Sequence, residues 1–277
     1  MEFKTLPNGE VIQQIAYGTY QSLSKECFEG VYHALDVGYT HIDTATLYQN
    51  EYYVGKAIKR SGKNREDVFV TTKIWNDMQG IEKAKISIEN SLKNLDLGYI
   101  DCMLIHWPIP TGHKHDYQKL NAQTFEVMEK YRQKGLIKHI GVSNFLPSHI
   151  DELYANTSLT PCINQIEMHA GLKQEELINY CNEKNILVSA WRPLLKGKCT
   201  TDETILAIAS EVKKTPAQVA LRYIVQKGCI PIPKSATKER IEENFDIFSF
   251  SLSKSQMELI DSLDENRVGP HPLTLNK

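Results

Sequence analysis

The chain has 277 residues, of which 41% are hydrophobic and 24% are charged, and its formal net charge is −2. These values are ordinary for a water-soluble globular protein that is long enough to bury a large core. The nearly balanced charge provides no basic field for a nucleic acid or an anionic membrane. We therefore expect no nucleic-acid partner and no membrane partner.

The six cysteines are scattered along the chain, and none belongs to a Cys-x-x-Cys pair, which argues against a zinc or redox motif. Reduced thiols in a cytoplasmic protein are the expected state. We find neither an apolar run long enough for a membrane helix nor the start of a signal sequence. His113 and His115 lack the further ligands that a metal site needs, so we expect no metal.

The predicted elements begin with a small hairpin over residues 3–11, turned by Pro7, Asn8 and Gly9. Short apolar strands then alternate with amphipathic helices. The expected strands cover residues 15–18, 41–44, 68–73, 100–106, 137–143, 163–167, 186–191 and 229–233. The expected helices cover residues 25–37, 50–60, 80–95, 118–134, 147–154, 174–184, 216–226 and 238–244, with two additional helices at 201–213 and 254–263.

The alternation of strands and helices predicts an α/β fold. Several strands are apolar on both faces, as in a sheet that is covered on both sides. Eight such units in a chain of this size favour a (β/α)8 TIM barrel over an open doubly wound sheet. No Gly-x-Gly-x-x-Gly follows the first strand, which argues against a Rossmann site. Without any linker-like stretch, we expect a single domain over residues 1–277.

Four polar residues that suit proton transfer stand at or just after the predicted strand ends, where such barrels carry their functional groups. A carbonyl that accepts a hydride needs a proton, and Tyr48 is the candidate donor. A free tyrosine has a pKa of about 10, and we expect the Lys73 ammonium to lower the pKa of Tyr48. Asp43 would keep Lys73 charged, and His106 could hydrogen-bond the substrate oxygen.

The motifs around these residues resemble those of the aldo-keto reductases. They are Asp-Thr-Ala-x-x-Tyr from Asp43 to Tyr48, Lys-x-Trp from Lys73, and Ile-His-Trp-Pro around His106. The resemblance runs over almost the whole chain and assigns the catalytic roles to these four residues. It implies a monomeric barrel with an N-terminal hairpin and two extra helices that reduces aldehydes, ketones or dicarbonyls with NADPH. The chain departs from the family pattern at Tyr52 and Tyr53, which could simply pack or could narrow the substrate mouth.

Polar and aromatic side chains after the fifth to seventh strands form a candidate nicotinamide site. Ser143, Asn144 and Gln165 offer donors and acceptors that suit a carboxamide group. Trp191 offers a flat apolar face on which the nicotinamide ring could stack, a role that the resemblance also implies.

The segment after the eighth strand is a candidate phosphate site. Lys234, Ser235 and Arg240 place two cations and a hydroxyl at the start of a helix, where the backbone amides and the helix dipole add to the attraction for an anion. An NAD site would more plausibly show a carboxylate for the free ribose hydroxyl, so we expect NADP(H). The family pattern matches here and would bring Glu243 and Asn244 to the adenine.

Two further cations could extend the cofactor site. The family usually has a small residue where this chain has Arg192, and Lys196 lies in a loop that in the family runs beside the pyrophosphate. We hypothesise that either side chain adds a phosphate contact. The complete predicted cofactor set is Gly18, Tyr20, Ser143, Asn144, Gln165, Trp191, Arg192, Pro193, Leu194, Lys196, Lys234, Ser235, Arg240, Glu243 and Asn244.

The substrate site is expected to be an aromatic box above the nicotinamide. Tyr20, Trp75 and Trp107 would form its walls and His106 its polar end, which suits a small-molecule carbonyl substrate. The short tail after Asp264 resembles that of small microbial reductases, including those acting on diketo sugar acids, and predicts a broad, shallow pocket. Two alternatives remain within the resemblance: a cofactor-binding regulatory protein like the potassium-channel beta subunits, or an endoperoxide reductase of the prostaglandin-forming type.

Overall fold

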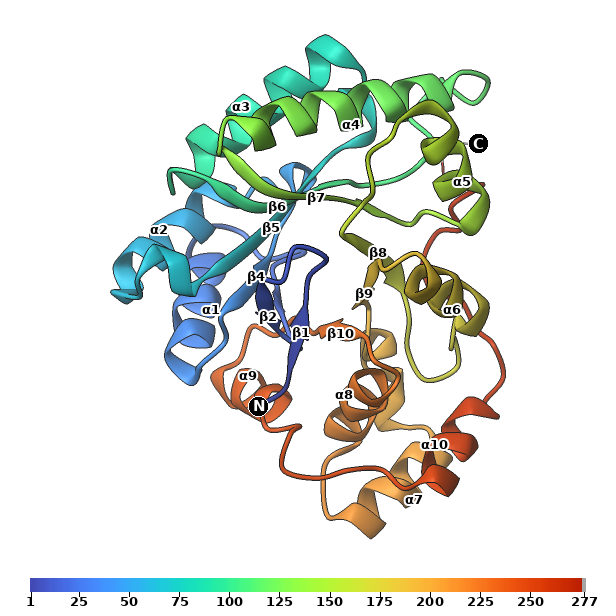
Figure 1. Ribbon diagram of the computed structural model, residues 1–277. Helices are drawn as coiled ribbons and strands as arrows, with labels where there is room; N and C mark the ends of the chain where they lie inside the picture. Colours follow the sequence, from blue (N-terminus) through green and yellow to red (C-terminus); the bar gives the residue numbers. More distant parts are fainter. Residues whose placement is uncertain (276–277) are drawn as a thin grey trace.

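The computed structural model describes residues 1–275. Its centre is an eight-stranded parallel sheet in the order β10-β9-β8-β7-β6-β5-β4-β3. The two edge strands meet, because Ala16 N donates to Pro231 O at 3.0 Å and Gly18 N donates to Pro233 O at 2.9 Å. These bonds close the sheet into a barrel. The helices surround the strands (Figure 1), so the predicted (β/α)8 TIM barrel is confirmed.

The elements follow the predicted order, with small differences at their ends. The barrel strands are β3 (Tyr17–Gly18), β4 (His41–Asp43), β5 (Phe69–Ile74), β6 (Ile100–Ile105), β7 (Ile137–Ser143), β8 (Ile163–Glu167), β9 (Leu187–Trp191) and β10 (Ile230–Ile232). The helices are α1 (Ser24–Val37), α2 (Glu51–Ser61), α3 (Ile81–Leu95), α4 (Tyr117–Gln133), α5 (Pro147–Asn156), α6 (Glu175–Glu183), α7 (Glu203–Val212), α8 (Pro216–Gln226), α9 (Lys238–Phe245) and α10 (Lys254–Asp261).

The predicted N-terminal hairpin is present, although its second strand begins where we expected it to end. It joins β1 (Phe3–Thr5) to β2 (Val11–Gln13), and its turn contains Gly9, whose φ of +92° suits glycine. Leu6 and Ile12 pack on buried residues that include Leu104 and Ile230. The hairpin lies over the barrel in the foreground of Figure 1 and covers its amino-terminal end. The functional residues must therefore lie at the opposite end.

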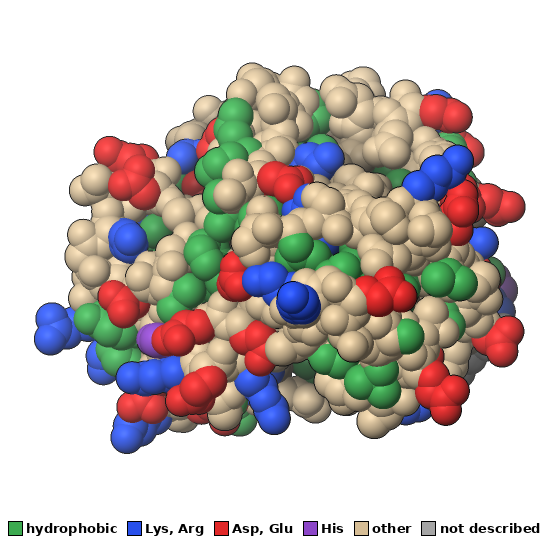
Figure 2. All heavy atoms as spheres, turned by 90° about the horizontal axis from the view of Figure 1, so that it is seen from below, with side chains coloured by type: hydrophobic (Ala, Val, Ile, Leu, Met, Phe, Trp, Pro, Cys, Tyr) green, Lys and Arg blue, Asp and Glu red, His purple; other side chains and the backbone are tan. Residues whose placement is uncertain are grey.

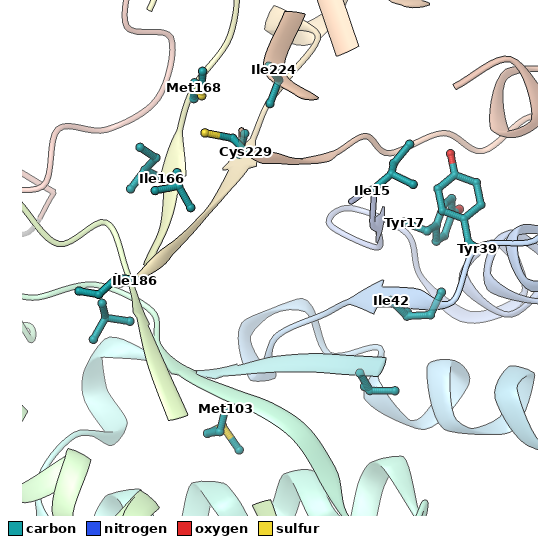
Figure 3. Packing of buried hydrophobic residues seen from close by; sticks show 14 of the residues in the cluster. Ile15, Tyr17, Tyr39, Ile42, Met103, Ile166, Met168, Ile186, Ile224 and Cys229 are labelled. Atoms are coloured by element: carbon teal, nitrogen blue, oxygen red, sulfur yellow. The ribbon is translucent and has the colours of Figure 1, made fainter. Parts of the chain in front are cut away.

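The barrel wall is buried on both faces. Every residue of β5 and of β6 is buried, as expected for parallel strands that carry helices outside and a packed core inside. Figure 3 shows part of this core, where Tyr17 lies beside Tyr39 with 5.9 Å between their ring centroids. The dense packing supplies a rigid frame for side chains at the strand ends.

The face of the molecule in Figure 2 carries both signs of charge. The face in Figure 2 shows lysine and arginine side chains interspersed with aspartates and glutamates. Within residues 1–275, none of the helices combines the length and apolar character needed to cross a membrane. All six cysteines are free and buried.

Candidate active site

A cavity of about 1110 Å³ opens where the barrel strands end at their carboxyl termini. Its walls include residues from the ends of all eight barrel strands, β3 to β10. Every residue that the sequence singled out for catalysis, cofactor binding or substrate binding lines this cavity, with the exception of Lys73. The Lys73 side chain is fully buried behind Asp43, which does line the cavity. The structure thus gathers residues up to 226 positions apart, from Gly18 to Asn244, around one space.

A buried ion pair lies under the cavity. Lys73 Nζ donates to Asp43 Oδ1 at 2.7 Å and to Thr44 O at 2.9 Å. The second carboxylate oxygen, Asp43 Oδ2, accepts from Gln165 Nε2 at 2.7 Å. Burial lowers the pKa of Lys73, and the adjacent Asp43 charge opposes that shift. The protein tolerates these two buried charges only because each one compensates the other.

Tyr48 follows β4 in a short 3-10 turn, Thr46–Tyr48, and is half-buried at the cavity wall. The Lys73 ammonium is 5.1 Å from the centroid of its ring. We expected this ammonium to lower the pKa of Tyr48, and that expectation is wrong for this geometry. Burial raises the pKa well above its usual value, and the nearby Asp43 carboxylate adds to the rise. The hydroxyl therefore carries its proton at neutral pH.

His106 stands beside Tyr48, with 5.9 Å between the ring centroids, and its ring also packs edge-on against Trp75 at 4.9 Å. Burial and the nearby Lys73 charge hold the pKa of His106 well below its usual range, so the imidazole is neutral near pH 7. A neutral imidazole offers one N–H donor. Its Nδ1 atom is buried and has no partner among the described residues. The cavity thus holds a phenol and an imidazole side by side.

The predicted nicotinamide residues form a connected network at the ends of β7, β8 and β9. Asn144 adopts φ +64°, a left-handed conformation that asparagine tolerates, and so turns its amide inward. The amide nitrogen donates to His106 O and Ser143 Oγ, while its oxygen accepts from Trp191 Nε1 at 2.8 Å. The Ser143 hydroxyl donates to Gln165 O at 2.9 Å. These bonds orient the Trp191 ring and leave acceptor capacity on the amide and hydroxyl oxygens.

The predicted phosphate site lies between β10 and the start of α9. The backbone N–H of Thr237 donates to Ser235 Oγ at 3.2 Å, which shapes the turn into the helix. Lys234 Nζ pairs with Glu26 of α1 at 2.9 Å, and Arg240 is exposed. The Lys234 ammonium has three donors, so this pair does not exhaust it. This part of the cavity lining therefore has two cations next to a helix N-terminus, and these groups suit a phosphate.

The two extra cations behave differently from each other. Lys196 is exposed at the cavity rim, in a left-handed conformation with φ +56°. Arg192 turns toward the chain terminus, where its Nη1 donates to Val268 O at 2.7 Å, and its guanidinium lies 5.2 Å from the Trp191 ring centroid. The sequence carried no signal for this contact.

The structure also adds residues to the cavity that we did not predict. Pro270 and Leu275 come from the C-terminal tail, and nothing in their local pattern marks them. Apart from Ala217 of α8, the others lie within or close to segments that the motifs had marked, so neighbouring positions could have been included. The additional lining residues are Gln21, Leu47, Gly197, Cys199, Thr200, Ala217, Ile232, Pro233, Ala236, Thr237, Pro270 and Leu275.

The barrel rim holds a protonated phenol, a neutral imidazole and a buried lysine–carboxylate pair, and a helix start with two cations lies beside them. Groups of this kind are expected in an oxidoreductase that uses a nucleotide cofactor. The chain matches the model of the Aldo/keto reductase family over residues 14–265. It is 41% identical to the glyoxal reductase of Bacillus subtilis over 96% of this chain and 95% of that protein. It is 39% identical to the methylglyoxal reductase DkgA of Escherichia coli, with the same coverage of each chain.

Solved structures agree with these relatives. An aldo/keto reductase from Brucella melitensis superimposes with a TM-score of 0.89 at 42% identity, over 95% of this chain and 99% of that one. A Bombyx mori aldo-keto reductase, crystallised with NADP, gives 0.88 at 37% identity, over 96% and 94%. The chain therefore belongs to the aldo/keto reductase family. It is an oxidoreductase that acts on carbonyl groups, and its cofactor is NADP(H).

Proposed function

We propose that this protein reduces small, uncharged aldehydes and dicarbonyls to alcohols, with Tyr48 as the proton donor. The observation that carries the proposal is the pairing of Tyr48 with His106 at the wall of the cavity, in front of the buried Lys73–Asp43 pair. The reduction direction needs a donor that holds its proton until charge develops on the substrate oxygen. The raised pKa of Tyr48 meets that need.

The other residues would act through position and charge. The neutral His106 would donate its N–H to the carbonyl oxygen and hold it near the Tyr48 hydroxyl. The Lys73 charge would stabilise the negative charge that forms as Tyr48 releases its proton. Asp43 would keep Lys73 charged and in place through the 2.7 Å ion pair. The nicotinamide, when bound, supplies the hydride.

The lining residues fit NADP(H). Trp191 is held by Asn144 in an orientation that presents its ring to the cavity. Lys234, Ser235 and Arg240 would hold the 2′-phosphate at the start of α9. Lys196 would face the pyrophosphate, and the carboxylate of Glu243, which also binds Thr215, would be available to the adenine with Asn244.

Removing the phosphate-site cations should change cofactor choice. We expect Lys234→Ala and Arg240→Ala each to raise the Kd for NADPH about tenfold. This corresponds to the loss of one charge-assisted contact worth roughly 1.4 kcal/mol. The Kd for NADH should stay nearly unchanged. Titration by nicotinamide fluorescence at two salt concentrations measures this. Lys238→Ala, on the same exposed helix start, is the matched control. Equal weakening of both cofactors would contradict a 2′-phosphate site.

The charge distribution around the cavity favours uncharged substrates. Tyr48 and His106 belong to the part of the cavity lining that comes from the ends of β3, β4, β5 and β6. Among the described residues, this part of the lining contains no lysine and no arginine. The lining cations come from the segments after β9 and β10 instead. A substrate carboxylate near His106 would lose its hydration without gaining a partner, at a cost of several kcal/mol. This argues for dicarbonyls of the methylglyoxal type and against keto acids.

A matched pair of substrates tests this choice. Methyl pyruvate and pyruvate present the same ketone, but only pyruvate carries a negative charge. We expect kcat/KM with NADPH to be at least about tenfold higher for the ester, because the charged group lacks a partner. Comparable values for the two would contradict the proposed uncharged substrate class. Turnover of methylglyoxal in the same assay tests the reductase proposal itself, since tight NADPH binding without turnover would favour a regulatory protein like the channel beta subunits.

We also propose that the protein acts as a monomeric, single-domain enzyme in the cytoplasm. The free, buried state of all six cysteines supports a reducing compartment. The closed barrel supports one folding unit. Sedimentation equilibrium of the purified protein tests the oligomeric state directly.

A further inference from the structure

The C-terminal tail forms a strap, residues 267–275, over one side of the cavity. After α10 the chain passes α6 and reaches the neighbourhood of α5 (red in Figure 1). Pro270 and Leu275 of the strap line the cavity. The strap is not part of any helix or strand, so its position depends on the contacts it makes.

Glu167, the last residue of β8, holds the beginning of the strap. Its carboxylate is fully buried, and Oε1 accepts from Val268 N and from Gly269 N, both at 2.8 Å. Arg267 Nη1 faces Oε2 at 3.1 Å, and His169 Nε2 lies 3.4 Å from Oε1. Burial opposes ionisation, but these partners hold the pKa of Glu167 below its usual value. A buried carboxylate with such a set of donors fixes the backbone that provides them.

Arg192 binds the carbonyl oxygen of Val268, the residue whose N–H binds Glu167. Its Nη1 donates to Val268 O at 2.7 Å, so both the N–H and the C=O of Val268 bind side chains from the barrel rim. At Gly269 an added Cβ would lie 2.3 Å from Trp191 Cη2 and 2.8 Å from Arg192 Nη1. Only glycine lets the strap pass this close to the indole. The position of the strap relative to the Trp191 ring is therefore fixed.

We propose that Glu167 is a positioning residue for substrate selection. By holding residues 267–269, it places Pro270 and Leu275 as an apolar outer wall of the substrate space. Such a wall gives a small carbonyl a surface to contact and excludes bulky ones. The inference rests on the proposed function, because it concerns which carbonyls reach Tyr48 and His106.

The test compares Glu167→Gln with Glu265→Gln, an exposed glutamate just before the strap. Glutamine keeps the side-chain size but removes the charge that Arg267 faces. The quantity to measure is kcat/KM for 1-phenyl-1,2-propanedione divided by kcat/KM for methylglyoxal. We expect this ratio to rise at least about tenfold in Glu167→Gln, because a lost steric contact has an effect of that size. The change should appear mainly in KM. Glu265→Gln should match the unmodified enzyme.

A second readout does not depend on activity. Trypsin should cut after Arg267 at least about tenfold faster in Glu167→Gln than in the unmodified protein, because released backbone opens more often. Mass spectrometry identifies the site. Truncation after Asn266 removes the strap but keeps every described helix and strand, since α10 ends at Asp261. The truncated protein should show the same shift in substrate ratio as Glu167→Gln.

The outcomes separate the inference from the function on which it rests. An unchanged substrate ratio in a folded Glu167→Gln protein would overturn the positioning role. If Glu167→Gln does not fold, an unchanged ratio in the truncated protein would overturn it instead. Failure of the unmodified protein to reduce methylglyoxal with NADPH would instead overturn the proposed function. In that case the trypsin comparison would still decide whether Glu167 holds the strap.

Discussion

Replacing Tyr48 with phenylalanine should reduce kcat for carbonyl reduction by about 10²- to 10⁴-fold, the range that general acid catalysis contributes. The phenylalanine ring keeps the packing against Tyr20 and His106 and removes only the hydroxyl. The Kd for NADPH should therefore stay within about twofold, because no cofactor contact is lost. Steady-state oxidation of NADPH with methylglyoxal measures the first quantity, and quenching of tryptophan fluorescence measures the second.

Tyr52→Phe is the matched control for this experiment. Tyr52 is 57% exposed on α2, where its ring packs edge-on against Tyr53 with 5.2 Å between the centroids. Tyr52 is not among the residues that line the cavity. The control should retain the activity of the unmodified protein. If Tyr48→Phe kept more than about a tenth of the activity, another group would have to supply the proton.

Breaking the buried pair should have the largest effect on stability. Lys73→Met leaves Asp43 buried with only the Gln165 donor, and Asp43→Asn leaves the Lys73 ammonium without a counter-charge. We expect each single change to lower the free energy of unfolding by about 3–5 kcal/mol, the usual cost of an uncompensated buried charge. Urea unfolding followed by circular dichroism measures this loss. Each variant should also lose reductase activity, since the charge next to Tyr48 is disturbed.

The double variant Asp43→Asn/Lys73→Met separates the two effects. Removing both charges leaves no buried ion, so most of the lost stability should return, with a coupling energy above about 2 kcal/mol. Activity should not return, because no charge remains behind the phenol. Lys59→Met is the control: Lys59 pairs with Asp96 on the surface, and its loss should cost no more than about 1 kcal/mol. Additive losses in the double variant would show that the pair is not coupled.

Much of the fold could be predicted because its signals are local. Apolar runs such as 100–106 are too short for helices and recur between amphipathic segments, and this alternation is typical of a barrel. Parallel strands bring their carboxyl ends to one rim, so polar residues at several strand ends had to meet there. The structure confirms that rim as the place where Asp43, His106 and Trp191 gather. The catalytic and binding roles of these residues stay predictions until the variants are measured.

The sequence by itself determined the barrel, the family and the chemical inventory of the site, since these depend on residue types at short spacings. The tertiary structure decided how those groups behave. The pKa of Tyr48 rises rather than falls because burial and the Asp43 carboxylate both raise it, and burial depends on every element around the cavity. Arg192 finds its partner 76 residues away and Glu167 finds its own 101 residues away. No local pattern encodes such contacts, because they exist only once the barrel brings distant segments within hydrogen-bonding distance.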